Sequence, residues 1–161
     1  MSSNTVSFLE PDLYVLGGDL AYDNNIPTCY LTWDYMLKHI PQNVYDYNTN
    51  TTRLIPMIMG VGNHDMGSMS FHHAPIPHNK HQPIYKHWFP QNTVNGSVPG
   101  LGGRGTYFSH KFGSKLHIIS LDTEYLDKME GRQTAWLEET LANSDAEIKI
   151  VQYHGPIYAA C

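Results

Sequence analysis

The sequence predicts a layered α/β fold in a single domain over residues 1–161, and three observations support it. Apolar runs at 13–16, 54–61 and 148–153 are typical of strands. Segments with helical periodicity lie between these runs, and alternation of strands with helices favours a sheet covered by helices. With 161 residues, of which 41% are hydrophobic, the chain is long enough to bury one core.

The first predicted helix covers residues 28–39. Pro27 is suited to the first turn of a helix, and Pro41 ends the segment. One face of this helix is expected to carry the apolar side chains, which are Tyr30, Trp33, Leu37 and Ile40. Residues 42–52 are polar and are expected to form a loop before the second strand.

Residues 66–104 show no clear periodicity and are rich in proline and histidine. Because this segment leaves directly from the end of the second strand, it is expected to form a long loop that lies over the strand ends. Its histidines, among them His72 and His73, are candidates for contact with a substrate. The alternative is a solvated loop whose histidines have no function.

The remaining elements are a hairpin, a helix and a strand. Residues 106–122 read as two strands turned at Gly113-Ser114, with Asp122 at the end of the second. Residues 133–142 have the pattern of an amphipathic helix with a packing role. Residues 148–153 read as a buried strand that ends at His154.

Two short motifs follow the first two strands and carry metal-binding side chains. The first is Gly18-Asp19-Leu20-Ala21-Tyr22, and the second is Gly62-Asn63-His64-Asp65. Ligands bind outside the carboxyl ends of strands in open α/β sheets, and carboxylate, amide and imidazole donors suit divalent metals. Either motif alone is equally compatible with an ordinary turn or helix cap. The two in this order, followed by His154 after a third strand, indicate a metal site.

These motifs resemble those of the calcineurin-like metallophosphoesterase superfamily, and Tyr22 makes the chain most similar to the purple acid phosphatase branch. The resemblance implies a metallophosphoesterase-type β-sandwich flanked by helices. It also implies that Asp19 bridges two metal ions, that Asn63 and His154 bind the second ion, and that Tyr22 binds the first. The two ions implied are iron paired with iron, zinc or manganese.

The resemblance also assigns roles around the metals. His64 is expected to stabilise the transition state or donate a proton, and Asp65 to orient His64 or cap the following segment. The implied reaction is phosphomonoester hydrolysis, as in acid phosphatases, by a hydroxide that bridges the metals. Two alternatives stay open: a metallophosphodiesterase that acts on nucleotides, and a non-catalytic binding module.

Two motifs of the superfamily are absent from the sequence. No Asp-x-His or Asp-x-Gly motif precedes Asp19, and no Gly-His-x-His motif follows His154. Metal pairs need more donors than the remaining motifs supply. The expectation at this point is therefore a fragment of a catalytic domain, incomplete at both ends, with a catalytically inactive fragment as the alternative.

Charge and composition limit the partners. The formal net charge is −5 and there is no basic run, so nucleic-acid binding is not expected. No apolar stretch approaches the ~20 residues of a membrane span. The expected ligand is a small phosphoester, and the sequence leaves the oligomeric state open. The sequons Asn50-Thr51-Thr52 and Asn95-Gly96-Ser97, like the family resemblance, lean towards a secreted or lysosomal protein.

Overall fold

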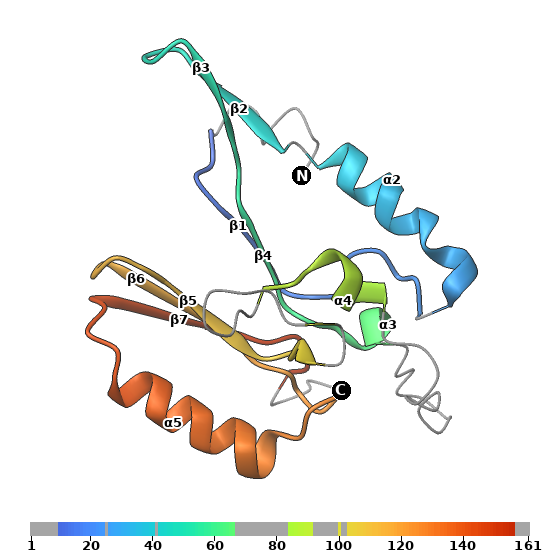
Figure 1. Ribbon diagram of the computed structural model, residues 1–161, viewed down its shortest axis with the longest axis vertical. Helices are drawn as coiled ribbons and strands as arrows, with labels where there is room; N and C mark the ends of the chain where they lie inside the picture. The colour runs from blue at the N-terminus through green and yellow to red at the C-terminus, as the bar shows by residue number, and fades with distance from the viewer. Residues whose placement is uncertain are drawn as a thin grey trace.

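The computed structural model describes residues 10–24, 26–40, 42–66, 84–91, 100 and 103–156. The strands form three small sheets (Figure 1). One holds the parallel pair β1 (Tyr14–Leu16) and β4 (Met57–Met59), and another the antiparallel hairpin β2 (Asn43–Asp46) and β3 (Thr51–Leu54). The third has the order β5 (Phe108–Phe112), β6 (Leu116–Ser120) and β7 (Ile148–Gln152), in which β6 pairs antiparallel with β5 and parallel with β7.

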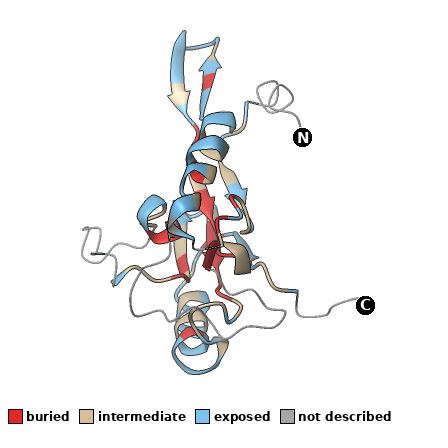
Figure 2. Ribbon diagram, turned by 90° about the vertical axis from the view of Figure 1, so that its right-hand side faces the viewer, coloured by how far each residue is buried: buried red, intermediate tan, exposed pale blue. Residues whose placement is uncertain are grey.

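Alternation along β4 explains the layers. Ile58 points to one side and packs with Phe108 of β5 and Ile118 of β6, which joins the two sheets face to face. Met59 points to the other side, where it packs with Trp33 and Tyr85 from the helices. The buried residues accordingly concentrate where the strands cross, in the middle of the molecule (Figure 2). The result is the mixed α/β sandwich that the sequence predicts.

The helices cover the sheets from outside (Figure 1). A 3-10 turn, η1 (Pro27–Cys29), leads into α2 (Leu31–His39), and α5 (Thr134–Ala142) follows the wide turn η3 (Met129–Gln133). Two short helices, α3 (Asn63–Met66) and α4 (Ile84–Trp88), lie near the ends of the strands. None of the helices in the described ranges has the length and apolar character needed to cross a membrane.

The carboxyl ends of the strands meet, and this positions the site. The Gly60 N–H extends the ladder of the first sheet by donating to Leu16 O at 2.7 Å. A Cβ on Gly60 would lie 3.2 Å from Ser120 Oγ at the end of β6 and 3.5 Å from Gln152 Nε2 at the end of β7. Side chains that follow β1, β4 and β7 can therefore share one region.

The structure corrects three details of the predicted elements. The expected loop 42–52 is replaced by the β2–β3 hairpin, which runs on to Leu54, a residue predicted to begin the second strand. The turn of the hairpin is held because Asp46 Oδ1 accepts the Asn48 N–H at 2.8 Å. The expected loop 66–104 contains α4, where the Tyr85 hydroxyl donates to Met59 O at 2.5 Å. Tyr30 is 51% exposed because it precedes the first full turn of α2, whereas Trp33 is fully buried.

The C-terminal half agrees with the predicted hairpin and helix but not with the predicted burial. The hairpin from Phe108 to Ser120 turns through Gly113, as expected. The strand β7 is at the edge of its sheet, so its apolar residues are exposed instead of buried; Ile148 is 58% exposed. The helix α5 contains no fully buried residue, although the Trp136 ring contacts that of Tyr107 at 4.9 Å.

Candidate functional site

Two strand-end loops form the candidate site. Residues 17–24 follow β1 and residues 60–65 follow β4, and these strands are parallel neighbours. The loops approach so closely that a Cβ on Gly18 would lie 2.6 Å from Gly62 N. A Cβ on Gly62 would lie 2.1 Å from Asp19 Oδ1. Both motif glycines are thus required by the contact between the loops.

Hydrogen bonds lock the two loops together. The Asp19 N–H donates to Asp65 Oδ2 at 2.7 Å, and the His64 N–H donates back to Asp19 Oδ1 at 2.9 Å. The Gly62 N–H also donates to Asp65 Oδ2, at 2.9 Å. Asp65 therefore caps α3 in the manner of a capping box and at the same time holds the Asp19 backbone. Capping is one of the two roles that the family resemblance implies for Asp65, the other being to orient His64.

The Asp65 carboxyl is fully buried and only half satisfied. Its Oδ1 atom has no hydrogen-bond partner among the described residues. Burial is the main cause that raises its pKa to about 6, and the nearby Asp19 and Asp23 carboxylates raise it further against the two N–H donors. Burying this carboxylate without a partner for Oδ1 is unfavourable, and Asp65 is the residue that fixes the geometry of both loops.

His154 approaches the same carboxylate from the end of β7. Its Nδ1 atom lies 3.0 Å from Gly17 O, and its Nε2 atom lies 3.1 Å from Asp19 Oδ2. The carbonyl can only accept, so Nδ1 carries the proton and donates. In the neutral ring, Nε2 then presents a lone pair to a carboxylate oxygen. Two acceptors at this distance require a cation between them, either a proton or a metal ion.

His64 is the second histidine near the Asp19 carboxylate. Its Nε2 atom is 4.0 Å from Asp19 Oδ2, and its Nδ1 atom is 2.6 Å from Asn24 Oδ1. The Asn24 Nδ2 group donates to Tyr22 O at 3.1 Å, which fixes the amide so that its oxygen faces the imidazole. His64 Nδ1 is therefore the donor, and Nε2 is the atom left to exchange a proton.

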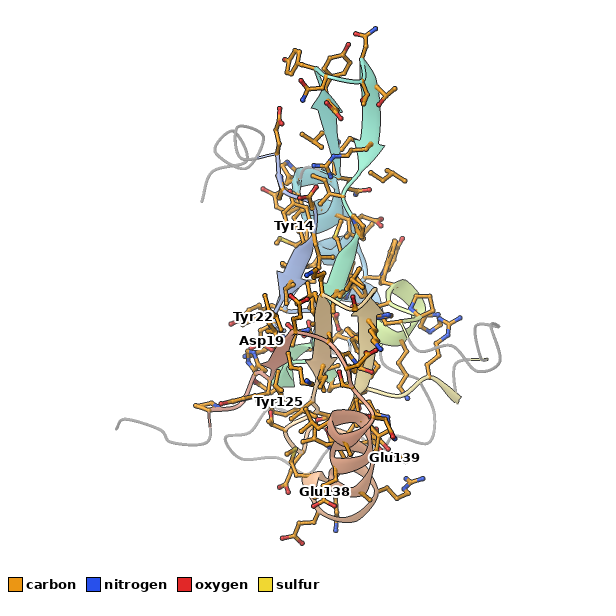
Figure 3. All side chains as sticks on the ribbon, turned by 90° about the vertical axis from the view of Figure 1, so that its left-hand side faces the viewer. Tyr14, Asp19, Tyr22, Tyr125, Glu138 and Glu139 are labelled. Atoms are coloured by element: carbon orange, nitrogen blue, oxygen red, sulfur yellow. The ribbon has the colours of Figure 1, made fainter. Side chains whose placement is uncertain are left out.

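Tyr22 packs its ring on His64, with the ring centroids 4.2 Å apart and the planes at 28°. Tyr22 is 54% exposed, and no contact joins its hydroxyl to the Asp19 carboxylate. Figure 3 labels Tyr22, Asp19 and Tyr125 on the loops at the strand ends. The loop is strained at three non-glycine residues with positive φ, namely Asp19, Tyr22 and Asn24.

The structure thus brings together four of the predicted site residues: Asp19, His64, Asp65 and His154. Asn63 is the half-buried first residue of α3, beside them in the chain. His72 and His73 lie outside the described residues. Within the described ranges, no three acidic, histidine or cysteine side chains are grouped closely enough to hold a metal. The core of the site is therefore the pair Asp19 and His154, with His64 at longer range.

Sequence reasoning missed two features of the site. Asn24 binds His64 through both its side chain and its backbone, since the Asn24 N–H also donates to His64 O at 2.9 Å. An asparagine shortly after a Gly-Asp turn is a weak signal, because asparagine is common in turns. The Gly155 N–H donates to Thr123 Oγ1 at 2.9 Å, which ties the His154 loop to the segment after β6. This link joins residues distant in sequence, and no motif announces it.

Comparison with models of protein families identifies the family of this chain. A family model for calcineurin-like phosphoesterases matches residues 4–161, nearly the whole chain. The chain belongs to the calcineurin-like phosphoesterase family. Calcineurin-like phosphoesterases are hydrolases that cleave phosphoesters with the help of two bound metal ions. No curated protein matches the chain in a sequence comparison.

Proposed function

We propose that this calcineurin-like phosphoesterase is a phosphomonoesterase of the purple acid phosphatase kind. Asp19, His154 and Asn63 hold metal, Tyr22 contributes a phenolate, and His64 serves the substrate as an acid. The observation that carries the proposal is the 3.1 Å approach of His154 Nε2 to Asp19 Oδ2 while His154 Nδ1 is engaged with Gly17 O. Histidines that ligate metals usually donate their other ring N–H in this way.

The donor set fits a divalent or trivalent first-row metal. Imidazole nitrogen, carboxylate oxygen and amide oxygen all suit such ions. The Asp19 side chain is 9% exposed, so a cation beside it is shielded from solvent. Asp65 contributes indirectly, because it holds the Asp19 backbone N–H from the buried side.

The metal ions, when bound, polarise phosphate oxygens and lower the pKa of bound water. The chain's own residues then position and protonate the substrate. His64 Nδ1 is held by Asn24, so His64 Nε2 faces the ester. As an oxygen from water bonds to phosphorus and the ester P–O bond breaks, the protonated Nε2 gives its proton to the leaving oxygen, and the products are inorganic phosphate and an alcohol. A positioned acid of this type contributes about 10²–10⁴ in rate.

The first experiment measures metal content and aryl phosphate hydrolysis in the same purified samples. We expect metal retention and turnover in the unaltered chain and loss of both in Asp19→Asn and His154→Ala. His39→Ala is the matched control, because His39 is an exposed histidine on α2. Unchanged metal content in His154→Ala would show that a proton, and not a metal ion, lies between His154 and Asp19.

A second comparison separates the two histidines of the site. His64→Ala is expected to retain the metal and to lose about 10²–10⁴ in kcat. Loss of metal to the same extent as in His154→Ala would assign His64 to the ligands and remove it from the acid role.

Tyr22 and the substrate class have their own tests. Tyr22→Phe keeps the ring that stacks on His64 but removes the hydroxyl, so a violet tyrosinate–iron band is expected in the iron-loaded chain and not in this variant. An aryl phosphate monoester is expected to be cleaved faster than the corresponding diester. The reverse order would favour a phosphodiesterase that acts on nucleotides.

A further inference from the structure

The β2–β3 hairpin projects from the rest of the molecule, and its outer face has an unusual composition (Figure 1). Val44 is buried and its cross-strand partner Arg53 reaches the main-chain carbonyl of Pro11, so one face of the hairpin is directed to the protein. The next pair, Tyr45 and Thr52, therefore lies on the opposite face. Both residues of this pair are exposed.

Two tyrosines and one asparagine occupy the tip of this face. Tyr47 is 80% exposed and Tyr45 is 41% exposed, and their rings meet edge to face with centroids 4.9 Å apart. The Tyr45 hydroxyl donates to Asn50 Oδ1. Asn50 is the last residue before β3 and adopts a positive φ of 56°, a conformation that asparagine tolerates in turns. Two exposed aromatic rings beside an asparagine can pack against a chemical group that is attached to the asparagine side chain.

The hydrogen bond from Tyr45 leaves the reactive atom of Asn50 accessible. It engages Oδ1, so the Nδ2 group points away from the tyrosine hydroxyl. Asn50, Thr51 and Thr52 are all exposed and complete the sequence Asn-x-Thr, the acceptor for N-linked oligosaccharides.

We propose that Asn50 is a site of N-linked glycosylation and that the first sugar packs on the Tyr45 and Tyr47 rings. The donor is an oligosaccharide linked through pyrophosphate to a membrane lipid. Asn50 Nδ2 attacks the anomeric carbon, and a new C–N bond forms as the bond from that carbon to the phosphate oxygen breaks. The lipid pyrophosphate leaves with the electron pair, and the proton from Nδ2 passes to a base of the transferase.

Stacking gives the exposed tyrosines a role. Sugar rings have a face of C–H groups that packs on aromatic rings, while their hydroxyls stay in water. Tyr45 stays bound to Asn50 Oδ1, because this oxygen is not consumed in the reaction. The apolar surface of the hairpin tip is then covered by a group attached to the same face.

The experiment translates the full chain behind a secretory signal sequence in the presence of microsomes. Asn95→Gln is the background, since Asn95 begins the other sequon and lies outside the described residues. We expect the product to gain one oligosaccharide that is released by peptide N-glycosidase, with conversion of Asn50 to aspartate. The modification takes place on the growing chain, so the result does not depend on how well the variants fold afterwards.

Matched variants make the assignment specific. Asn50→Gln and Thr52→Ala are expected to abolish the gain, because each destroys the sequon. Thr51→Ala keeps the sequence Asn-x-Thr, and Asn48→Gln alters an exposed asparagine of the same turn, so both are expected to retain the gain. The proposal is overturned if Asn50 stays unmodified while a known acceptor protein in the same microsomes is glycosylated.

Stacking is tested by amide hydrogen exchange in residues 43–54. The secreted chain is trimmed to a single sugar by an endoglycosidase and compared with Asn50→Gln. We expect severalfold slower exchange in the trimmed glycoprotein, retained in Tyr47→Phe and lost in Tyr47→Ala. Equal exchange with and without the sugar would overturn the stacking and leave only the attachment.

Discussion

Two strand-end corners of this molecule are each built on a buried aspartate, and they differ in how completely that carboxylate is satisfied. After β6, Asp122 accepts the N–H groups of Tyr125, Leu126 and Asp127 and the Thr106 hydroxyl. Among the residues that the structure describes, Asp65 after β4 accepts only the Asp19 and Gly62 N–H groups, both on the same oxygen, and no partner reaches its other oxygen.

The comparison distinguishes a structural acid from one next to a functional site. Burial raises the pKa of both carboxyls, so exposure alone does not separate them. Donors on both oxygens make Asp122 a fixed part of the fold. Asp65 is left with an unpaired oxygen next to Asp19, whose own carboxylate faces two histidines. Incomplete satisfaction marks the corner that is available for chemistry.

The largest expected effect is on stability, and it comes from removing the Asp122 carboxylate. Asp122→Ala leaves three N–H groups without their acceptor, although the Thr106 hydroxyl keeps Asp127 Oδ2, so we expect the free energy of unfolding to fall by about 4 kcal/mol or more. Urea denaturation measures it. Glu138→Ala on the exposed side of α5 is the control and is expected to change stability by less than about 0.5 kcal/mol. A small loss in Asp122→Ala would contradict the structural assignment.

The next effect concerns the pH dependence of stability in the metal-free protein. The pKa of Asp65 is about 6 in the folded state against an ordinary 3.8, so the folded state binds its proton more tightly. The free energy of unfolding is therefore expected to fall as pH rises from about 4 to 6, by about 3 kcal/mol, and to level off above that. Denaturation midpoints across this range measure the fall.

Asp65→Asn sharpens the same test. Without a titrating group at this position, the curve between pH 4 and 6 is expected to flatten. Asp122 leaves a residual slope of the same sign, because burial raises its pKa too. A curve identical to that of the unaltered chain would mean that Asp65 is not the group that titrates.

A smaller expected effect targets the contact between the two loops of the site. Gly62→Ala places a Cβ where Asp19 Oδ1 lies, so Asp19 must move. We expect turnover of aryl phosphate to fall by about 10²-fold, with weaker metal retention. Gly17→Ala is the matched control, because a Cβ at Gly17 meets nothing within 4 Å. Equal activity in the two variants would show that the close approach is dispensable.

The smallest expected effect comes from Asn24. In Asn24→Ala, His64 Nδ1 loses its acceptor, and we expect kcat to fall by up to about 10-fold with metal content and KM unchanged. Steady-state kinetics with an aryl phosphate measure the change, and Asn48→Ala in the distant hairpin is the control. A change in KM alone would show that Asn24 acts on binding rather than on the orientation of His64.

The elements that the sequence predicted well are those whose signal is local. The strand before Asp19, the hairpin turned at Gly113 and the helix 133–142 follow from apolar runs and turn residues, and the two motifs located Asp19 and His64. The residues proposed as metal donors follow the strands in sequence because parallel strands bring their carboxyl ends to one edge of a sheet.

The misses depend on tertiary contacts. The polar sequence of residues 42–52 predicts a loop in place of the β2–β3 hairpin, because the order of these strands depends on Asp46 and on the pairing between them. The exposure of β7 reflects its position at the edge of the sheet, which a run of apolar residues does not reveal. The role of Asn24 arises from a contact 40 residues away in sequence.

The edge formed by β7 has a practical consequence for handling the protein. Within the described residues, no strand pairs with β7 on the side away from β6, and Ile148 and Ile150 are exposed along it. A free row of backbone donors and acceptors beside apolar side chains is a template for strands of other molecules. Lys149 supplies the only charge within this strand. Solubility at high protein concentration will therefore depend on this edge. Charged substitutions there will raise the concentration at which the protein stays in solution.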